Sequence, residues 1–167
     1  MEAERGHGKR LRGERVKMKK LTHIDDRGEA SMVDVSAKPV MFREAVASGE
    51  VRLQQATVRL IDSHTIAKGN VLAAARLAGI MAAKKTGELI PLCHPLPLTH
   101  CEVNFAVPRT HDRIIITATA RIAAQTGVEM EALTAVSVAA LTIYDMCKAV
   151  DKTMRMTNVR LVSKTKR

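Results

Sequence analysis

The sequence predicts an α+β domain of the ferredoxin-like kind, with split βαβ order, an antiparallel sheet and helices packed on one face. Three observations lead to this fold class. From residue 40 the expected elements run strand, short helix, helix, strand, strand, helix, strand. The helix nearest the C-terminus is long and apolar, as expected for a core helix. The length of 167 residues and the hydrophobic fraction of 46% suit one domain with a sizeable core.

Two strands are expected first in the chain. Residues Ala30 to Val35 fit a short strand, with apolar residues close together. A second strand follows Pro39, because its apolar residues are separated by even numbers of positions, the spacing of one strand face. These residues are Val40, Phe42 and Val46.

Helices are expected in the next segment. Residues Gln54 to Ser63 predict a short helix, and Asn70 is a suitable N-cap for a helix from Val71 to about Lys85. Regular structure is not expected between residues 90 and 98, since proline lacks an amide donor and fixes its own backbone angle. The prolines are Pro91, Pro95 and Pro97.

Two strands, a long helix and a last strand complete the pattern. The two strands are expected over Cys101–Val107 and Arg113–Ile122, and the last strand over Met156–Val162. A capping box over residues 126–129 predicts the start of the long helix, which should continue to about residue 150.

The long helix also predicts an oligomer. Between Glu131 and Asp145 its polar residues are few, namely Thr134, Ser137 and Thr142. One face of a sheet covers only one side of a helix. A helix that is apolar most of the way round therefore needs a second partner, which we expect another copy of the chain to supply.

The distribution of charge argues against a nucleic-acid-binding domain. The formal net charge is +10. Residues 1–20 carry eight Lys or Arg and three Glu, and residues 148–167 carry seven basic residues and one Asp, whereas residues 21–147 carry twelve basic and thirteen acidic residues. The basic charge is thus concentrated at the ends, and three aromatic residues offer little to stack on bases. We expect no specific nucleic acid as partner, a disordered basic leader over 1–20 and a single domain over 21–167.

Cysteine usage and targeting signals predict a cytoplasmic protein. The three cysteines include no CxxC pair, which is typical of a reducing compartment. The sequence shows no evident apolar run of membrane-spanning length, and residues 1–20 lack the apolar segment of a secretory signal. We therefore expect no membrane partner.

Residues 93–101 could alternatively form a zinc site. Cys93, His94, His100 and Cys101 are all residue types that bind zinc. Their spacing does not match common sites, because the four form two adjacent pairs, and neighbours on a strand point to opposite faces. We expect no metal here, and a loop in which the prolines hold Cys93 and His94 at the wall of a pocket. A zinc-stabilised interaction domain remains open as an alternative.

Three charged residues could support acid–base chemistry. Asp145 and Lys148 lie three positions apart on a helix and share a face. This is typical of a surface ion pair, but the apolar flanks predict partial burial, which would lower the pKa of the lysine towards that of a general acid or base. Lys68 precedes Gly69 in a loop, either as a mobile surface lysine or as one on a hinge that closes over an anionic substrate.

Two acids open the long helix. Glu129 is accounted for by the capping box and by the positive end of the helix. Glu131 is less well explained. It precedes Asp145 by fourteen residues, so the two lie within about 40° around the helix axis. Its carboxylate could accept hydrogen bonds from an amide and an amino group together, as on the Watson–Crick edge of guanine.

Several blocks resemble the molybdenum cofactor biosynthesis protein C family, the cyclic pyranopterin monophosphate synthases. The similarity covers about residues 21–164, with the blocks in the family's order. The blocks are Met32–Ser36, Lys68-Gly69, Ala78–Lys84, Leu89–Pro95, Thr126–Thr134 and Ala139–Val150.

This resemblance implies a function and a set of site residues. Family members convert a cyclised dihydro-GTP to a pyranopterin with a cyclic phosphate, releasing diphosphate, in a rearrangement that needs no redox cofactor; we expect no cofactor. Lys68 and Lys148 would be the acid/base lysines and Asp145 the catalytic carboxylate. The substrate would be lined by Leu92, Cys93, His94, Glu129, Met130 and Glu131. The resemblance also implies a homohexamer, a trimer of dimers, with its sites at subunit interfaces.

Two positions depart from the family pattern. Asn70 stands where many members have Asp, which is equivalent as an N-cap. The family continues beyond the position of Lys164 in a tail containing Gly and Lys, whereas this sequence reads Ser163-Lys164-Thr165-Lys166-Arg167. Lys164 or Lys166 is expected to take over any phosphate contact of that tail.

Overall fold

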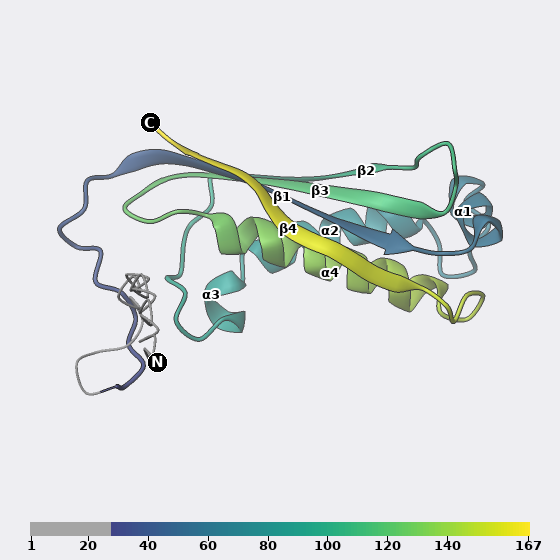
Figure 1. Ribbon diagram of the computed structural model, residues 1–167, viewed down its shortest axis with the longest axis horizontal. Coiled ribbons are helices and arrows are strands. Elements are labelled where there is room, and N and C mark those ends of the chain that lie inside the picture. Colours follow the sequence, from purple (N-terminus) through teal and green to yellow (C-terminus); the bar gives the residue numbers. More distant parts are fainter. Residues whose placement is uncertain (1–27) are drawn as a thin grey trace, which may run out of the picture. The chain divides into compact units, whose positions relative to one another are not determined.

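The computed structural model describes residues 28–167, of which Met32–Arg167 form one compact unit. The predicted leader, and the predicted domain start at residue 21, lie outside the described residues. The unit is built on one antiparallel sheet with strand order β2-β3-β1-β4 (Figure 1). The strands are β1 (Met41–Arg52), β2 (His100–Ala106), β3 (Arg113–Ala124) and β4 (Arg155–Lys166).

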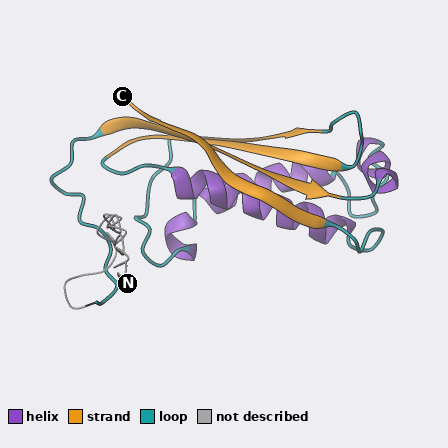
Figure 2. Ribbon diagram, in the orientation of Figure 1, coloured by secondary structure: helices purple, strands orange, loops and turns teal. Residues whose placement is uncertain are grey.

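Helices cover one face of this sheet (Figure 2). They are α1 (Gln55–Asp62), α2 (Val71–Ala83), α3 (Thr86–Leu89) and α4 (Glu129–Cys147). Ala45, Ala47 and Val51 of β1 are fully buried, while the even-numbered residues between them are partly exposed, so the odd-numbered positions face the helices. The element order and the one-sided helical layer confirm the predicted α+β fold of ferredoxin-like type.

Small residues allow α4 to approach its neighbours closely. A Cβ atom on Gly49 of β1 would lie 2.7 Å from Cγ1 of Val136, and one on Gly79 of α2 would lie 2.8 Å from the backbone oxygen of Ala135. Both distances are shorter than real Cβ contacts. The packing of α4 on the sheet and on α2 therefore depends on glycine at these two positions.

Two predictions about local structure are wrong: the first strand and the capping box of the long helix. Residues 31–35 of the expected strand have no regular structure, and a turn follows in which the Lys38 amide donates to the Val35 carbonyl at 2.9 Å. β1 already has β3 and β4 on its two sides, so it offers no further edge to this segment. The capping box is also absent, since α4 begins without a side-chain cap and the Glu129 carboxylate binds Lys164 instead.

The other elements lie close to their predicted positions. Asn70 caps α2 as expected, its Oδ1 accepting from the Ala73 amide at 3.0 Å. The long helix ends at Cys147 rather than near residue 150, because the amides of Val150 and Asp151 turn back to the Cys147 carbonyl. The short helix α3 was not predicted, and β4 is longer than expected at its C-terminal end.

Helix α4 contradicts the expectation that no apolar run is long enough to span a membrane. Among the described residues it is the one helix that is long and apolar enough to cross a membrane. Its buried residues Ala132, Ala135, Val136 and Ala139 instead belong to the core between the sheet and α2. Such a composition is also typical of the core helix of a folded domain.

Candidate functional site

Lys68, Asp145 and Lys148 meet at the C-terminal end of α4. Lys68 Nζ donates to Asp145 Oδ2 at 2.9 Å, and Lys148 Nζ lies 2.6 Å from Asp145 Oδ1. Lys68 Nζ also donates to the backbone oxygen of Asp145 at 2.9 Å, near the negative end of the helix. The loop before α2 carries Lys68, and Gly69 there has a φ of 95°, a backbone angle that favours glycine. Two cations therefore share one carboxylate.

The three side chains are about half exposed in the single chain, with exposed fractions of 47%, 57% and 55%. Hydrogen bonds from Lys148 and then Lys68 lower the pKa of Asp145 to about 2. The hydrogen bond to Asp145 raises the pKa of Lys148. The predicted lowering of the lysine pKa is thus wrong for Lys148 in the single chain, because nothing among residues 28–167 covers this end of the helix enough to outweigh the hydrogen bond to Asp145.

At the N-terminal end of α4, burial shifts the pKa values of two groups towards their neutral forms. Glu131 is buried, with 3% of its surface exposed. Burial, and secondarily the charge of Glu129, raise its pKa from the usual 4.5 to about 7. Burial also raises the pKa of the Cys93 thiol, with a further contribution from Glu131. Cys93 and Glu131 are therefore electrostatic neighbours, although they are distant in sequence.

The other residues expected around the substrate lie near this end. Leu92, Cys93 and His94 are half-buried in the loop after α3, and Met130 is 37% exposed on the first turn of α4. The Nε2 atom of His94 is 2.9 Å from the Val33 carbonyl, so His94 ties the segment before β1 to this loop.

The two groups do not meet within one chain. Fourteen residues separate Glu131 from Asp145, and a rise of 1.5 Å per residue places them about 21 Å apart along α4. The two residues have similar angles around the helix axis but are far apart along it. A single copy therefore holds two separate groups of candidate residues, one at each end of α4.

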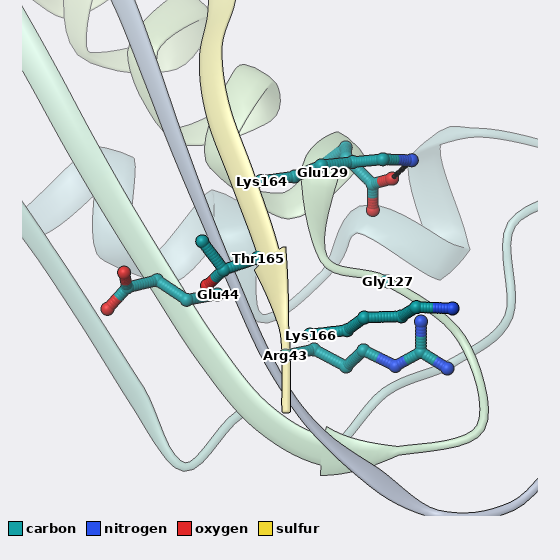
Figure 3. Close-up of a pocket in the computed structure, with 7 residues that line it drawn as sticks. All are labelled: Arg43, Glu44, Gly127, Glu129, Lys164, Thr165 and Lys166. Carbon is teal, nitrogen blue, oxygen red and sulfur yellow. Dashed lines mark hydrogen bonds and ion pairs between the residues drawn. The ribbon is translucent and has the colours of Figure 1, made fainter.

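A cationic pocket of about 340 Å³ lies beside the N-terminal end of α4 (Figure 3). Its lining residues are Arg43, Glu44, Gly127, Glu129, Lys164, Thr165 and Lys166. Lys164 Nζ donates to Glu129 Oε1 at 2.7 Å. Burial alone would raise the pKa of Glu129, but the Lys164 ammonium outweighs it and holds that pKa below its usual value. Sequence reasoning missed Arg43, whose place here depends on the register between β1 and β4.

The described residues 28–167 contain no group of three or more His, Cys, Asp or Glu arranged to hold a metal ion. Cys93 and Cys101 are separate, half-buried free thiols. Burial, and then the charge of Glu102, raise the pKa of Cys101 to about 11, so that thiol is protonated at neutral pH.

Residues 32–167 match the MoaC family. The chain belongs to this family. A cyclic pyranopterin monophosphate synthase of Chloroflexus aggregans is 60% identical over 144 residues, covering 86% of this chain and 87% of the relative. One of Parvibaculum lavamentivorans is 56% identical over 147 residues, covering 88% and 92%. Cyclic pyranopterin monophosphate synthase 3 of Mycobacterium tuberculosis is 58% identical over 145 residues, covering 87% and 81%. Family membership favours the enzyme over the nucleic-acid module and the zinc domain considered from sequence.

Proposed function

We propose that this protein is a lyase of molybdenum cofactor biosynthesis, a cyclic pyranopterin monophosphate synthase. It converts (8S)-3',8-cyclo-7,8-dihydroguanosine 5'-triphosphate to cyclic pyranopterin monophosphate and releases diphosphate. The relatives that bear this name cover most of the chain. The structural observation that carries the proposal is the pair of lysines on the Asp145 carboxylate.

The two lysines are suited to move protons during a rearrangement of the purine and ribose. Lys68 and Lys148 approach the two different oxygens of Asp145, so one carboxylate orients both ammonium groups. A lysine needs a lowered pKa to act as a base near neutral pH. Coverage by a second chain and by substrate would remove water from this cluster and lower the lysine pKa values. Asp145 is then the group that positions the lysines and keeps a negative charge beside them.

Glu131 is the residue proposed to recognise the guanine ring through hydrogen bonds. Its buried carboxylate has a pKa of about 7, so a ligand that donates hydrogen bonds to it would favour the ionised form. An amide and an adjacent amino group on the substrate supply such donors. We assign Leu92, Cys93, His94, Glu129 and Met130 to the same substrate-binding half-site.

An oligomer is required to bring the half-sites together. The bonds that change lie in the purine and ribose, next to the base that Glu131 would hold. Lysines about 21 Å away along the same helix cannot reach those bonds. We therefore propose sites at subunit interfaces, each combining the N-terminal end of one α4 with the C-terminal end of another, in a homohexamer built as a trimer of dimers. The exposed apolar side chains of Leu77, Met81 and Leu141 on the helices support such an assembly.

The proposed enzyme acts in the cytoplasm without a cofactor, and its ligand is the small-molecule substrate. A direct experiment incubates the purified protein with the cyclised dihydro-GTP and follows pyranopterin and diphosphate together. We expect the two products in equal amounts. If a folded, oligomeric protein gives neither product, the proposed function is wrong.

A further inference from the structure

Asp151 is a buried acid that the proposed mechanism does not use. It lies in the loop between α4 and β4 and has 1% of its surface exposed. Its Oδ2 atom accepts from the Gln54 amide at 2.8 Å and from the Thr57 hydroxyl at 3.1 Å. Its Oδ1 atom accepts from the amide and the hydroxyl of Thr153 at 2.9 and 2.8 Å. One carboxylate therefore joins its own loop to a segment that lies 97 and 94 residues away in the sequence.

This carboxylate keeps its charge without a cation. Burial raises the pKa of Asp151, but the hydrogen bonds from Gln54, Thr153 and Thr57 outweigh it and hold that pKa below its usual value. The ion pairs among residues 28–167 do not include Asp151. A buried charge depends on its hydrogen bonds, because each donor that is lost leaves an acceptor unsatisfied. Asp151 is therefore held tightly to its four donors.

The two lysines of the proposed mechanism lie on the two segments that Asp151 joins. Lys148 directly follows α4, three residues before Asp151, and the Asp151 amide turns back to the Cys147 carbonyl at 3.0 Å. Thr57 lies in the first turn of α1, and the chain passes from α1 into the loop that carries Lys68. Helix α1 and the end of α4 are at the same end of the sheet (Figure 1).

The loop that carries Lys68 is attached to α1. The Thr65 amide donates to the Leu60 carbonyl of α1 at 3.0 Å. A further backbone hydrogen bond, from the Gly69 amide to the Ile66 carbonyl at 2.9 Å, closes the loop around Lys68. A displacement of α1 relative to α4 would therefore also displace Lys68 relative to α4.

Asp151 and Lys68 act on a common neighbour at the end of α4. Burial, and secondarily the charge of Asp151, raise the pKa of the Cys147 thiol to about 11, while the charge of Lys68 opposes this change. Both charges are thus close to the same thiol. Asp151 therefore lies near the lysine end of α4 in space as well as in sequence.

We propose that Asp151 is a positioning residue for the two lysines that share Asp145, an inference that rests on the proposed function. Lys68 and Lys148 come from different segments, and both must come within hydrogen-bond distance of one carboxylate. Asp151 joins these segments through buried hydrogen bonds and so sets the distance between the lysines. Displacing a catalytic group by about 1 Å can cost on the order of a hundredfold in rate.

The test compares two threonine variants that each remove one hydroxyl donor from Asp151. Thr57→Val removes the donor on α1, whereas Thr153→Val removes a local donor and leaves both contacts to α1 in place. Thr57→Val should lower kcat several-fold, and Thr153→Val should stay close to the wild type. Asp151→Asn should lower kcat by about tenfold to a hundredfold. KM should change little in each variant, because substrate recognition is assigned to the other end of α4.

A second measurement reports on the lysines without turnover. Lys148 Nζ lies 2.6 Å from Asp145, and this pairing favours the protonated amine, which acetic anhydride does not modify. Brief labelling followed by mass spectrometry should show faster modification of Lys148 in Asp151→Asn and in Thr57→Val than in the wild type. The exposed Lys38 is the internal reference.

A core variant controls for loss of stability alone. Ile116 of β3 is fully buried and contacts neither lysine segment through a hydrogen bond. Ile116→Val should lower Tm, as removal of a buried methylene group does, and leave kcat and the labelling of Lys148 unchanged. A residue that only stabilises the fold would behave in the same way.

Two results would overturn the inference. These are equal kcat values for Thr57→Val and Thr153→Val, and labelling of Lys148 in Thr57→Val at the wild-type rate. The threonine variants decide the question if Asp151→Asn does not fold. Turnover by the wild type that is unaffected by Thr57→Val removes only this inference. Labelling that depends on Thr57 in a wild-type protein without turnover removes the proposed function and leaves Asp151 as the residue that positions the lysines.

Discussion

The two ends of α4 show opposite ways of holding charge in one protein. At the C-terminal end, two exposed lysines contact Asp145, and these contacts shift the pKa values of Asp145 and Lys148 towards their charged forms. At the N-terminal end, burial shifts the pKa of Glu131 and Cys93 towards the neutral form. The C-terminal end carries the two lysines proposed to move protons, and the N-terminal end carries the buried carboxyl group of Glu131, which can accept hydrogen bonds. Under the proposed function, the two ends are complementary halves of one type of site.

The largest expected effect is on the lysine end. Lys148→Ala and Lys68→Ala should each reduce turnover by about a hundredfold to ten-thousandfold, the usual contribution of a general acid or base. The fold should survive, since both side chains are about half exposed. Single-turnover kinetics with circular dichroism on the same samples checks both points.

Two controls sharpen this prediction. Lys148→Arg should not restore turnover, because arginine stays protonated at any accessible pH. Lys152→Ala removes another exposed lysine just after α4 and should leave the rate close to that of the wild type. Wild-type rates in a folded Lys148→Ala protein would remove Lys148 from the mechanism.

The acidic end should show a dependence of stability on pH. Glu131 has a pKa of about 7 in the folded chain against the usual 4.5, so the folded chain retains a proton that the unfolded chain has released. Stability is therefore highest below about pH 4.5 with respect to this group, and it falls as pH rises towards 7, by on the order of 3 kcal/mol. Glu131→Gln should flatten the change of Tm between pH 5 and 8. An unchanged pH profile in that variant would show that Glu131 does not titrate as the structure indicates.

The middle of α4 provides a comparison that involves neither end. Gly79→Ala places a Cβ 2.8 Å from the Ala135 backbone oxygen, and a backbone atom cannot move aside as a flexible side chain can. Overpacking of this kind lowers the free energy of unfolding by about 1–3 kcal/mol, despite the higher helix propensity of alanine. Chemical denaturation measures the change. A more stable variant would mean that α2 and α4 pack less closely than described.

Glu129→Gln should have the smallest effect. Its pair with Lys164 is partly exposed, and such pairs contribute about 0–1 kcal/mol to stability. Thermal melts of Glu129→Gln and Glu131→Gln at pH 8 compare the two acids of the first turn. We expect Glu129→Gln to lower Tm slightly and Glu131→Gln to raise it. The opposite order would reverse the roles assigned to the two acids.

Much of the fold follows from local patterns in the sequence. Asn70, the prolines after α3 and the alternation in β1 act over a few residues, so their consequences can be predicted from the chain. The expected strand at Ala30–Val35 failed because a strand needs a pairing partner elsewhere in the chain, and this segment is not part of the four-stranded sheet. The capping box failed because the Glu129 carboxylate pairs with Lys164, which lies 35 residues away in the sequence.

The site was predictable in composition but not in arrangement. The family resemblance named Lys68, Asp145 and Lys148, and the structure brings them together. Arg43 carries no local signal, because it reaches its pocket only through the pairing of the first and last strands. The separation of Glu131 from Asp145 becomes evident once α4 is described as one continuous helix with these residues near its opposite ends.

Complementation between two inactive variants tests the central claim most directly. Lys148→Ala damages the C-terminal end of α4, and Glu131→Ala damages the N-terminal end. If each site takes one end from each of two chains, random co-assembly in equal amounts leaves about a quarter of the sites intact. Co-expressed and co-purified chains should then regain about a quarter of wild-type turnover, while a mixture of separately assembled variants stays inactive. If the co-assembled oligomers are no more active than either variant alone, the two ends of α4 do not form a shared site between subunits.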